Sequence, residues 1–465
     1  MTGRWREAVL PIVLAAVAAL GVGIDAGAGE PDPLPGRTEP AGHVAAKAVF
    51  CPPSQREGTA VTDLYAGVTG AGEATVGIEP AAADRPSLAP GELLVHHVEG
   101  HDPVNVVGYG APVTAGAAAS FGSRGAGAAR CAESAATSWF FAEGSSALGF
   151  DERILVYNPF LDEAVVRVSF LTPEGERSKA ALSDIPVPAQ SAKAIAVNEF
   201  IFQKRQLGVS VEAARGRVVA WRALTADPKE GIGGVQFDLG ASSPSATWYF
   251  PEGGLAPGLE ERIAILNPGE EEATVTISLA TANDGVQPPR LVEIPIAAKT
   301  SASFSLSDSA PRGLGDVGGV SAVVTSTNAV EVVAERTVVY DGAGIQGIAS
   351  EVGATTTHES WWLPPAAAQP TTDVVTVMNP GADDAVVSIS LLRASGTPLA
   401  PARLEAIRLK AGARLKIPVG ALSRGRPMAA LVTADAPIVA ERFSYSDAGG
   451  DVASVIGIPV ERSEE

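Results

Sequence analysis

The chain has 465 residues, a length that favours roughly three or four domains over a single core. Hydrophobic residues make up 46% of it, so cores can form, and its 50 Gly and 35 Pro indicate many turns. The formal net charge is −19. Nucleic acid is bound by a dense basic face, which the sequence lacks, so nucleic acid is excluded as an expected partner.

Residues 1–28 have the pattern of a targeting segment. Arg4 and Arg6 precede an uncharged, mostly apolar run over residues 8–24, and small residues follow it. The run is near the minimum length for a bilayer span, so a cleaved signal peptide and an uncleaved signal anchor both stay open. In either case we expect an extracytoplasmic protein that meets a membrane only through residues 8–24. Residues 29–45, rich in Pro and Gly, are expected to be a linker.

The chain has two cysteines, Cys51 and Cys131. In an oxidising compartment an even number favours a disulfide, with two buried free thiols as the alternative. No histidine or asparagine motif accompanies either cysteine, so a catalytic thiol is not expected. The bridge would join the start and the end of one module.

The downstream sequence repeats with a period of about 110 residues, which is the signature of tandem modules. A motif Trp-x-Phe-x-Glu-Gly, weakened in its last copy, opens each repeat at Trp139, Trp248 and Trp361-Trp362. A strand ending in an Asn-Pro turn follows, at Asn158, Asn267 and Asn379. There Asn accepts a hydrogen bond from the backbone two residues on, and Pro presets φ for the turn. Next comes an alternating apolar run, typical of a strand with one face in a core.

A second motif, Val-Val-Ala-x-Arg, recurs late in each repeat. It places Arg222, Arg336 and Arg442, and an aspartate stands five residues beyond each, at Asp227, Asp341 and Asp447. We expect these arginines to serve the fold, paired either with those aspartates or with the opening tryptophans through cation–π contacts. The four opening tryptophans are expected to anchor module packing, and the alternative is an aromatic platform for a sugar ring.

A degenerate first copy lies upstream, without the Asn-Pro turn or the arginine, and Val104–Val107 is expected to replace the Val-Val-Ala strand. We predict an all-β chain of four tandem immunoglobulin-like β-sandwich modules after an N-terminal apolar targeting helix. The expected modules are residues 46–137, 138–246, 247–359 and 360–465. We expect them to follow one another as a rod.

These motifs, taken as a set, resemble repeats of an uncharacterised family of exported actinobacterial proteins. The shared features are an opening Cys-Pro, a second Cys, and the Trp-x-Phe-Ala-x-Gly-Ser motif that ends here at Ser145. The resemblance covers roughly residues 46–460. It implies β-sandwich modules in the cell envelope and no particular activity.

The sequence offers little chemistry. His97, Glu99 and His101 would share a face if they lay on one strand, which makes them weak metal candidates beside a solvated turn. No catalytic motif, metal site or cofactor is otherwise indicated. We expect a non-catalytic envelope scaffold whose partners are envelope proteins or glycans. The alternatives are a wall-carbohydrate-binding protein that uses exposed tryptophans and, less favoured, an envelope enzyme.

Overall fold

The computed structural model describes residues 46–460 with the exception of 55–59, 71, 81–83, 100–102, 231–232, 256–257, 282–284, 287–290, 307–318, 343–344, 366–371, 395–396, 424 and 447–450. The expected targeting segment and linker lie outside the described residues. Within the described part, no helix is both long enough and apolar enough to cross a membrane. Residues from Val44 onward belong to one compact unit.

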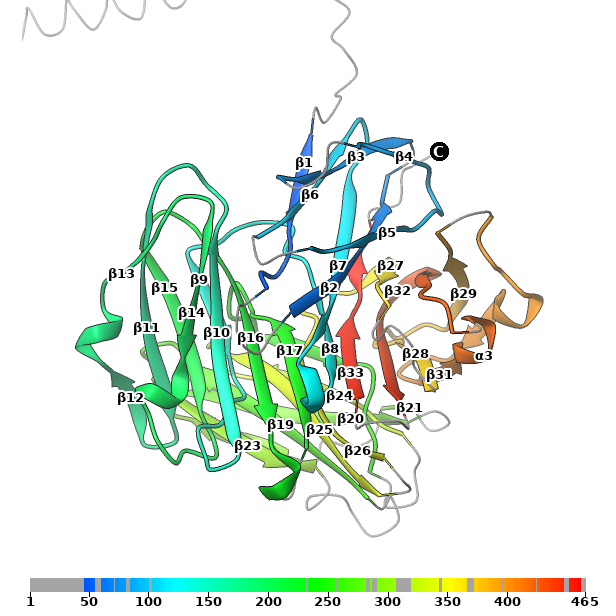
Figure 1. The fold of residues 1–465 in the computed structure, drawn as a ribbon. Helices are drawn as coiled ribbons and strands as arrows, with labels where there is room; N and C mark the ends of the chain where they lie inside the picture. Colours follow the sequence, from blue (N-terminus) through cyan, green and yellow to red (C-terminus); the bar gives the residue numbers. More distant parts are fainter. Residues whose placement is uncertain are drawn as a thin grey trace, which may run out of the picture. The chain divides into compact units, whose positions relative to one another are not determined.

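Almost every element is a β-strand (Figure 1). The first module holds β1 (Lys47–Phe50), β2 (Ala60–Val68), β3 (Ala74–Glu79), β4 (Ser87–Leu88), β5 (Leu94–His97), β6 (Asn105–Tyr109), β7 (Val113–Ser120) and β8 (Ala126–Arg130). The second holds β9 (Ser138–Phe141), β10 (Phe150–Asn158), β11 (Ala164–Thr172), β12 (Gly175–Ser178), β13 (Ile185–Val187), β14 (Ser191–Ala196), β15 (Gly208–Arg215), β16 (Val219–Ala226) and β17 (Gly234–Leu239).

The third module holds β18 (Thr247–Phe250), β19 (Leu259–Asn267), β20 (Ala273–Thr281), β21 (Gly285–Val286), β22 (Leu291–Ile296), β23 (Thr300–Ser305), β24 (Ser321–Ser326), β25 (Val333–Gly342) and β26 (Ile345–Val352). The fourth holds β27 (His358–Leu363), β28 (Thr372–Met378), β29 (Ala385–Leu392), β30 (Ile407–Leu409), β31 (Arg414–Pro418), the short helix α3 (Gly420–Ser423), β32 (Ala429–Ser446), β33 (Asp451–Ile456) and β34 (Ile458–Pro459).

All four modules share one topology of two antiparallel sheets. In the first module the sheets run β1-β6-β3-β4 and β5-β2-β7-β8. The later modules keep this order and add one short strand each: β12 on β11, β21 on β20 and β34 on β27. In the fourth module β32 is a single strand that pairs in both sheets, where the other modules use two strands. The predicted all-β fold of four sandwiches is therefore confirmed.

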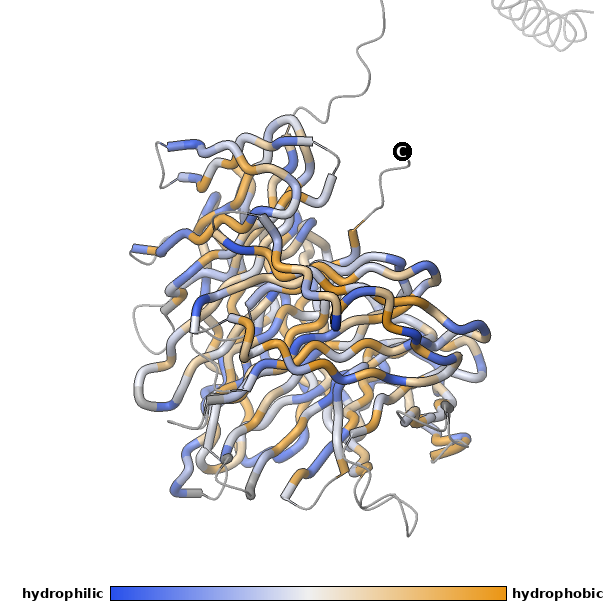
Figure 2. The backbone as a smooth tube through the Cα atoms, turned by 90° about the vertical axis from the view of Figure 1, so that its right-hand side faces the viewer, coloured by the Kyte–Doolittle hydropathy of each residue, from blue (hydrophilic) through white to orange (hydrophobic). Residues whose placement is uncertain are grey.

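The strands form where the sequence alternates. In β20 the side chains of Ala273, Val275 and Ile277 are fully buried, while the residues between them are partly exposed. Figure 2 shows the same alternation of hydrophobic and hydrophilic residues along many strands. This pattern is expected when one face of a sheet packs on a core.

Two details differ from the sequence predictions. Val104–Val107 was expected to replace the Val-Val-Ala strand, but Asn105–Val107 belongs to β6, and the strand equivalent to β16 and β25 is β7. The hydrogen bond from Cys131 N to Ala115 O matches the bonds from Gly240 to Ala220 and from Gly353 to Ala334 in later copies. Ala117 therefore stands at the arginine position of the first module. The boundary expected at 359/360 falls inside β27, so the fourth module begins earlier.

Strand β8 and its equivalents in the other modules, β17, β26 and β33, meet at the centre of the unit; we call them the eighth strands after their place in the first module. β8 contacts β17, β17 contacts β26, β26 contacts β33, and β33 contacts β8, so the modules close into a ring. Figure 1 shows β8, β17 and β33 side by side in the middle of the fold. The expected rod is therefore wrong, because the fourth module packs against the first as well as against the third. We call the four junctions the 1–2, 2–3, 3–4 and 4–1 seams.

Candidate functional site

The opening tryptophans are buried. Trp139, Trp248 and Trp361 are at most 3% exposed, and Trp362 is 1% exposed. The indole N–H groups of the first three donate to the carbonyls of Val218, Val332 and Ile438 at 2.7, 2.8 and 2.8 Å. Burial with a satisfied N–H favours packing anchors, because a sugar platform needs an exposed ring face.

The Asn-Pro turns have the same hydrogen bonds in all three copies. The Oδ1 atoms of Asn158, Asn267 and Asn379 accept from the backbone N–H two residues on at 3.1, 2.9 and 3.0 Å. Their Nδ2 groups donate to carbonyls four residues on, and also to the carbonyls of the last residues of β13, β22 and β30. Each asparagine thus ties a turn to the neighbouring sheet.

Arg222 is the centre of the 2–3 seam. Its guanidinium is fully buried and lies 3.0 Å from both carboxylate oxygens of Asp238 in its own module. It also donates to Glu335 of the third module. The same Glu335 Oε2 accepts from the backbone N–H groups of Ala142 and Glu143 at 3.0 Å each. One carboxylate therefore binds the arginine and the opening motif of the preceding module together.

The 3–4 seam repeats this arrangement. Arg336 donates to Glu441 of the fourth module at 3.0 and 2.6 Å, and to Ser454 at 2.8 Å. Glu441 Oε2 also accepts from the backbone N–H of Glu252 at 2.9 Å. We call these two arrangements the Arg–Glu latches.

The expected arginine partners were wrong where the structure describes them. Asp227 accepts from the backbone of Lys229, and not from Arg222. The side chain of Asp341 and all of Asp447 lie outside the described part. The aromatic ring near Arg222 is Phe141 at 5.7 Å, two residues past Trp139.

The 4–1 seam has no latch. Arg442 pairs inside its own module with Asp373, with Nε at 2.8 Å from Oδ1. Gly116 of the first module stands where a latch glutamate would be, and a Cβ there would lie 2.5 Å from Pro364. Apolar residues from both modules fill this seam: Tyr65, Leu93, Ala118, Trp362, Leu392, Ala429 and Ile458.

The predicted disulfide Cys51–Cys131 is confirmed, with a Cα–Cα distance of 4.3 Å. It links the residue directly after β1 to the residue directly after β8, so it joins the start and the end of the first module. The backbone bonds align Cys51 with Phe141 and Phe250, and Cys131 with Gly240 and Gly353. The bridge thus replaces a contact in which a phenylalanine ring covers a glycine.

Burial dominates the electrostatics of the latches. It raises the pKa of Glu152 to about 8 and that of Asp238 to about 7, although Arg222 lowers both. At the 3–4 seam, burial raises the pKa of Glu261 to about 8 against the lowering effect of Arg336. The opening glycines make room for these carboxylates, since a Cβ on Gly144 would lie 2.7 Å from both oxygens of Glu152.

The histidine cluster does not form a described metal site. β5 ends at His97, so Glu99 lies beyond the strand and the shared strand face does not exist. His97 is 83% exposed and pairs with Asp63. His101 lies outside the described residues, and no cluster of metal-ligating side chains is found among those described.

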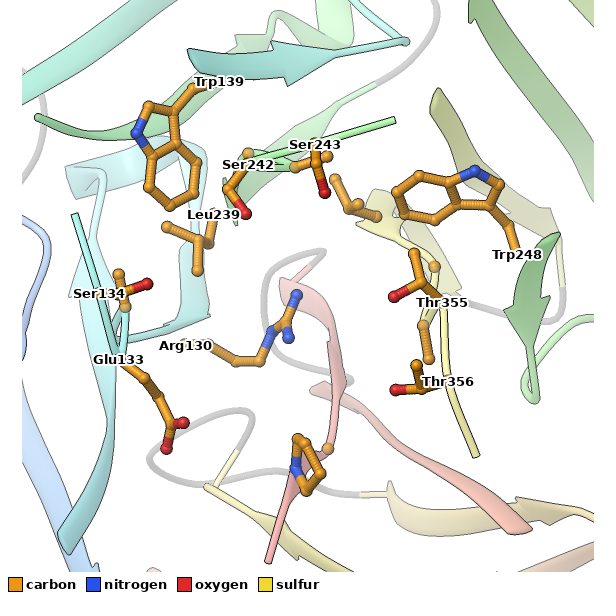
Figure 3. Close-up of a pocket in the computed structure, with 18 of the residues that line it drawn as sticks. Arg130, Glu133, Ser134, Trp139, Leu239, Ser242, Ser243, Trp248, Thr355 and Thr356 are labelled. Carbon is orange, nitrogen blue, oxygen red and sulfur yellow. The ribbon is translucent and has the colours of Figure 1, made fainter. Parts of the chain in front are cut away.

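The sequence analysis missed one pocket, which lies where the chain leaves the eighth strands. We call it the axial pocket. Its volume is about 240 Å³, and all four modules line it. Figure 3 shows the Arg130 side chain among hydroxyl-bearing residues of three module linkers. These are Ser134, Ser242, Ser243, Thr355 and Thr356, and Trp139, Trp248 and Trp361 line it as well.

Arg130 is the cation of the axial pocket, which Glu133 also lines. Its Nε has no hydrogen-bond partner among the described residues, and its Nη2 lies 3.7 Å from Glu351 Oε1. Guanidinium and hydroxyl groups together suit a carboxylate or another oxyanion. A signal for the pocket was present in the sequence: Ala132-Glu133-Ser134 recurs as Ala241-Ser242-Ser243 and Ala354-Thr355-Thr356.

Comparison with known proteins gives a family but no activity. None of the curated proteins matches the chain. The structure of Thermotoga maritima 1070 is similar at 21% identity and a TM-score of 0.21, over 24% of this chain and 95% of that one. The Anabaena sensory rhodopsin transducer is similar at 26% identity and a TM-score of 0.17, over 20% of this chain and 96% of that one.

These TM-scores are too low to support a conclusion about fold or function. The model of a family of unknown function, DUF5719, matches residues 81–237 and 239–459, so the chain belongs to that family.

Proposed function

We propose that this chain is a non-catalytic, exported protein of the cell envelope whose four modules close into a rigid interaction scaffold. The observation that supports the proposal is that the buried ion pairs of Arg222 and Arg336 lie at the seams between modules. Arg222, Arg336 and their carboxylate partners join one module to the next, with side chains at most 1% exposed. Their chemistry is used to hold the ring together.

Export is supported by the sequence and by the bridge. Residues 8–24 form an apolar run behind two arginines, as in a signal sequence. The Cys51–Cys131 disulfide suits an oxidising compartment outside the cytoplasm. The repeat motifs also resemble those of exported actinobacterial proteins.

The absence of a catalytic role is supported by the lining of the axial pocket. Its hydroxyl groups are not accompanied by a histidine or a cysteine among the described lining residues. A serine nucleophile needs an adjacent base within hydrogen-bond reach. Glu133, the carboxylate of the pocket, is paired with Lys47 at 3.3 Å.

The axial pocket is the proposed contact point of the scaffold. The Arg130 guanidinium and the surrounding hydroxyls would receive a carboxylate of an envelope protein. The second candidate is a wall carbohydrate, favoured by the three tryptophans and five hydroxyls that line the same pocket. Such a sugar would enter the pocket, because the tryptophans form no exposed platform.

Binding of the purified exported chain to a glycan array and to envelope proteins tests the proposal. We expect capture of an envelope protein, lost in Arg130→Ala and kept in Arg177→Ala, since Arg177 is exposed on the outer strand β12. Saturable glycan binding that depends on Arg130 would favour the carbohydrate alternative. If Arg130→Ala binds as tightly as the native chain, the axial pocket is not the contact point. Turnover of any substrate would overturn the non-catalytic role.

A further inference from the structure

Glu143 and Glu252 occupy the same position in two homologous seams. Each stands four residues after its opening tryptophan and faces the next module. Both are at least nine-tenths buried, at 7% and 2% exposure. Their surroundings nevertheless differ, and the difference identifies what is missing at the 2–3 seam.

Glu252 is fully satisfied by the fourth module. Arg414 Nη2 donates to its Oε2 at 3.0 Å, and Lys416 Nζ donates to its Oε1 at 2.6 Å. The hydroxyl of Thr376 donates to it as well. Burial raises the pKa of Glu252, but Lys416 and Arg414 lower it overall to below its usual value.

The third module lacks all three partners at the matching positions. In the strand register, Lys416 lies opposite Thr376, three residues before Asn379, and Ser303 lies opposite Ala264, three residues before Asn267. Ser303 is therefore the equivalent of Lys416. By the same register Ser301 replaces Arg414, and Ala264 replaces Thr376. Ser301 donates its hydroxyl elsewhere, to Leu171 O at 2.8 Å. Ser303 Oγ is buried and has no hydrogen-bond partner among the described residues.

A cavity lies beside Glu143, which we call the Glu143 cavity. Its volume is about 230 Å³, and Phe150, Leu224 and Ile348 give it apolar walls. Glu143 and Gln236 are among its lining residues, and Glu143 Oε2 and Gln236 Oε1 are buried acceptors that have no hydrogen-bond donor among the described residues. A buried acceptor without a donor is costly, so this lining favours a ligand that donates hydrogen bonds.

The other charged residues that line the cavity are Arg205, Asp227 and Arg262, and of these Arg262 is the cation that acts on Glu143. The Nε of Arg262 is buried without a hydrogen-bond partner among the described residues, and it lies 3.6 Å from Glu260 Oε1, so a carboxylate of its own strand faces this cation. Burial raises the pKa of Glu143 to about 7, and Arg262 lowers it only in part. Glu143 is therefore short of the positive charge that Lys416 gives to Glu252.

From this juxtaposition we propose that the Glu143 cavity binds a primary ammonium group, which supplies the positive charge that Lys416 supplies to Glu252 at the 3–4 seam. The ammonium donates to Glu143 Oε2 and Gln236 Oε1, and its alkyl part lies on the apolar walls. The group comes either from a small free amine or from a lysine side chain of a partner. Leu148, 78% exposed, stands at the rim and marks the open side.

Calorimetric titration of the full chain with propylammonium chloride and with Nα-acetyl-lysine amide tests the proposal. We expect saturable binding of at least one of them and a raised thermal unfolding midpoint. Tetramethylammonium, which has charge but no N–H, should not bind. Tighter binding of the lysine derivative identifies a partner's lysine as the source, whereas binding of propylammonium alone identifies a free amine.

Three variants locate the site. Glu143→Gln should weaken binding about tenfold or more, the loss expected for a hydrogen bond to a charged group. Ser303→Lys, which copies the 3–4 seam, should abolish binding and raise the unfolding midpoint without any amine. Lys416→Ser should lower the midpoint and add a second propylammonium site beside Glu252.

The proposal is overturned if neither amine binds the native chain, or if Glu143→Gln binds as tightly as the native chain. It is also overturned if Ser303→Lys, shown to be folded by circular dichroism, still binds propylammonium. None of these outcomes depends on the axial pocket, so the scaffold proposal can fail while this one stands.

Discussion

The first and third modules are stabilised by different interactions. Each is a closed sandwich that packs against two neighbouring modules. The third module uses charge, with Glu335 reaching back to the second module and Arg336 reaching forward to the fourth. The first module has Gly116 and Ala117 at those two positions and carries a disulfide instead.

The difference shows that the latch residues work in pairs across seams. Because the first module has no latch arginine, the second module needs no glutamate to bind it. Trp221 occupies the glutamate position of the second module and donates its indole N–H to Arg130 O at 3.0 Å. Because the first module has no glutamate at the latch position, Arg442 forms its ion pair with Asp373 of its own module. Apolar residues pack across both seams that the first module shares, including Phe121 against Phe237 at the 1–2 seam.

Arg222→Met should give the largest loss of stability. It leaves Asp238 and Glu335 buried without their cation, which costs about 3–5 kcal/mol. Urea unfolding measures this, and Arg177→Met, an exposed arginine on β12, should stay within about 0.5 kcal/mol of the native chain. A loss below about 1 kcal/mol would show that the latch adds little beyond the apolar packing around it.

Removing the bridge should come next. Cys51→Ala with Cys131→Ala should cost about 2–5 kcal/mol, because the unfolded chain loses a long-loop constraint. Cys51→Phe with Cys131→Gly, which copies the Phe141-over-Gly240 contact, should recover part of that loss. Urea unfolding of both pairs checks this. No recovery would mean that the first module has diverged too far to accept the contact of its sister modules.

Gly67→Val should weaken the 4–1 seam. A Cβ there would lie 2.6 Å from Trp362 Nε1, so the seam must shift, at about 1–3 kcal/mol for overpacking. Hydrogen exchange should then speed up in β2 and β27 before it does so in β19 or β25. Gly72→Val is the matched control, since its nearest neighbour would be 3.8 Å away. Uniform loss of protection would show that the ring opens as one unit.

The sequence was informative wherever the determinants are local. The Asn-Pro turns bond within a few residues, and alternation within nine-residue strands such as β20 defines the sheets. The Cys51–Cys131 pair followed from the number of cysteines and the position of the first module. These features could be predicted because each depends on residues that are close in sequence or few in number.

The ring could not be predicted in the same way. Glu335 lies 113 residues from Arg222, and neither residue looks unusual by itself. One signal was available: glutamate precedes the arginine at 335 and 441 but tryptophan does at 221. Adjacent residues on a strand point to opposite faces, so a Glu-Arg pair there can reach two different neighbours. Because residues of all four modules line the axial pocket, the pocket could not be predicted without first predicting the ring.

The smallest predicted effect concerns pH at the 2–3 seam. Burial raises the pKa of Glu152 to about 8 from an ordinary value of 4.5. The folded chain therefore binds a proton that the unfolded chain releases between these values, so this group's contribution to stability falls as pH rises through that window. Glu252 at the 3–4 seam has the opposite sign, because its pKa is lowered.

Glu152→Gln should flatten the decline in stability between about pH 5 and about pH 8 by about 1 kcal/mol or more. The amide keeps the shape of the side chain and its bond from the Ser145 N–H while removing the titration. Urea unfolding at several pH values measures the slope in both chains. An unchanged slope would place the proton on Asp238, the other carboxyl beside Arg222 whose pKa burial raises.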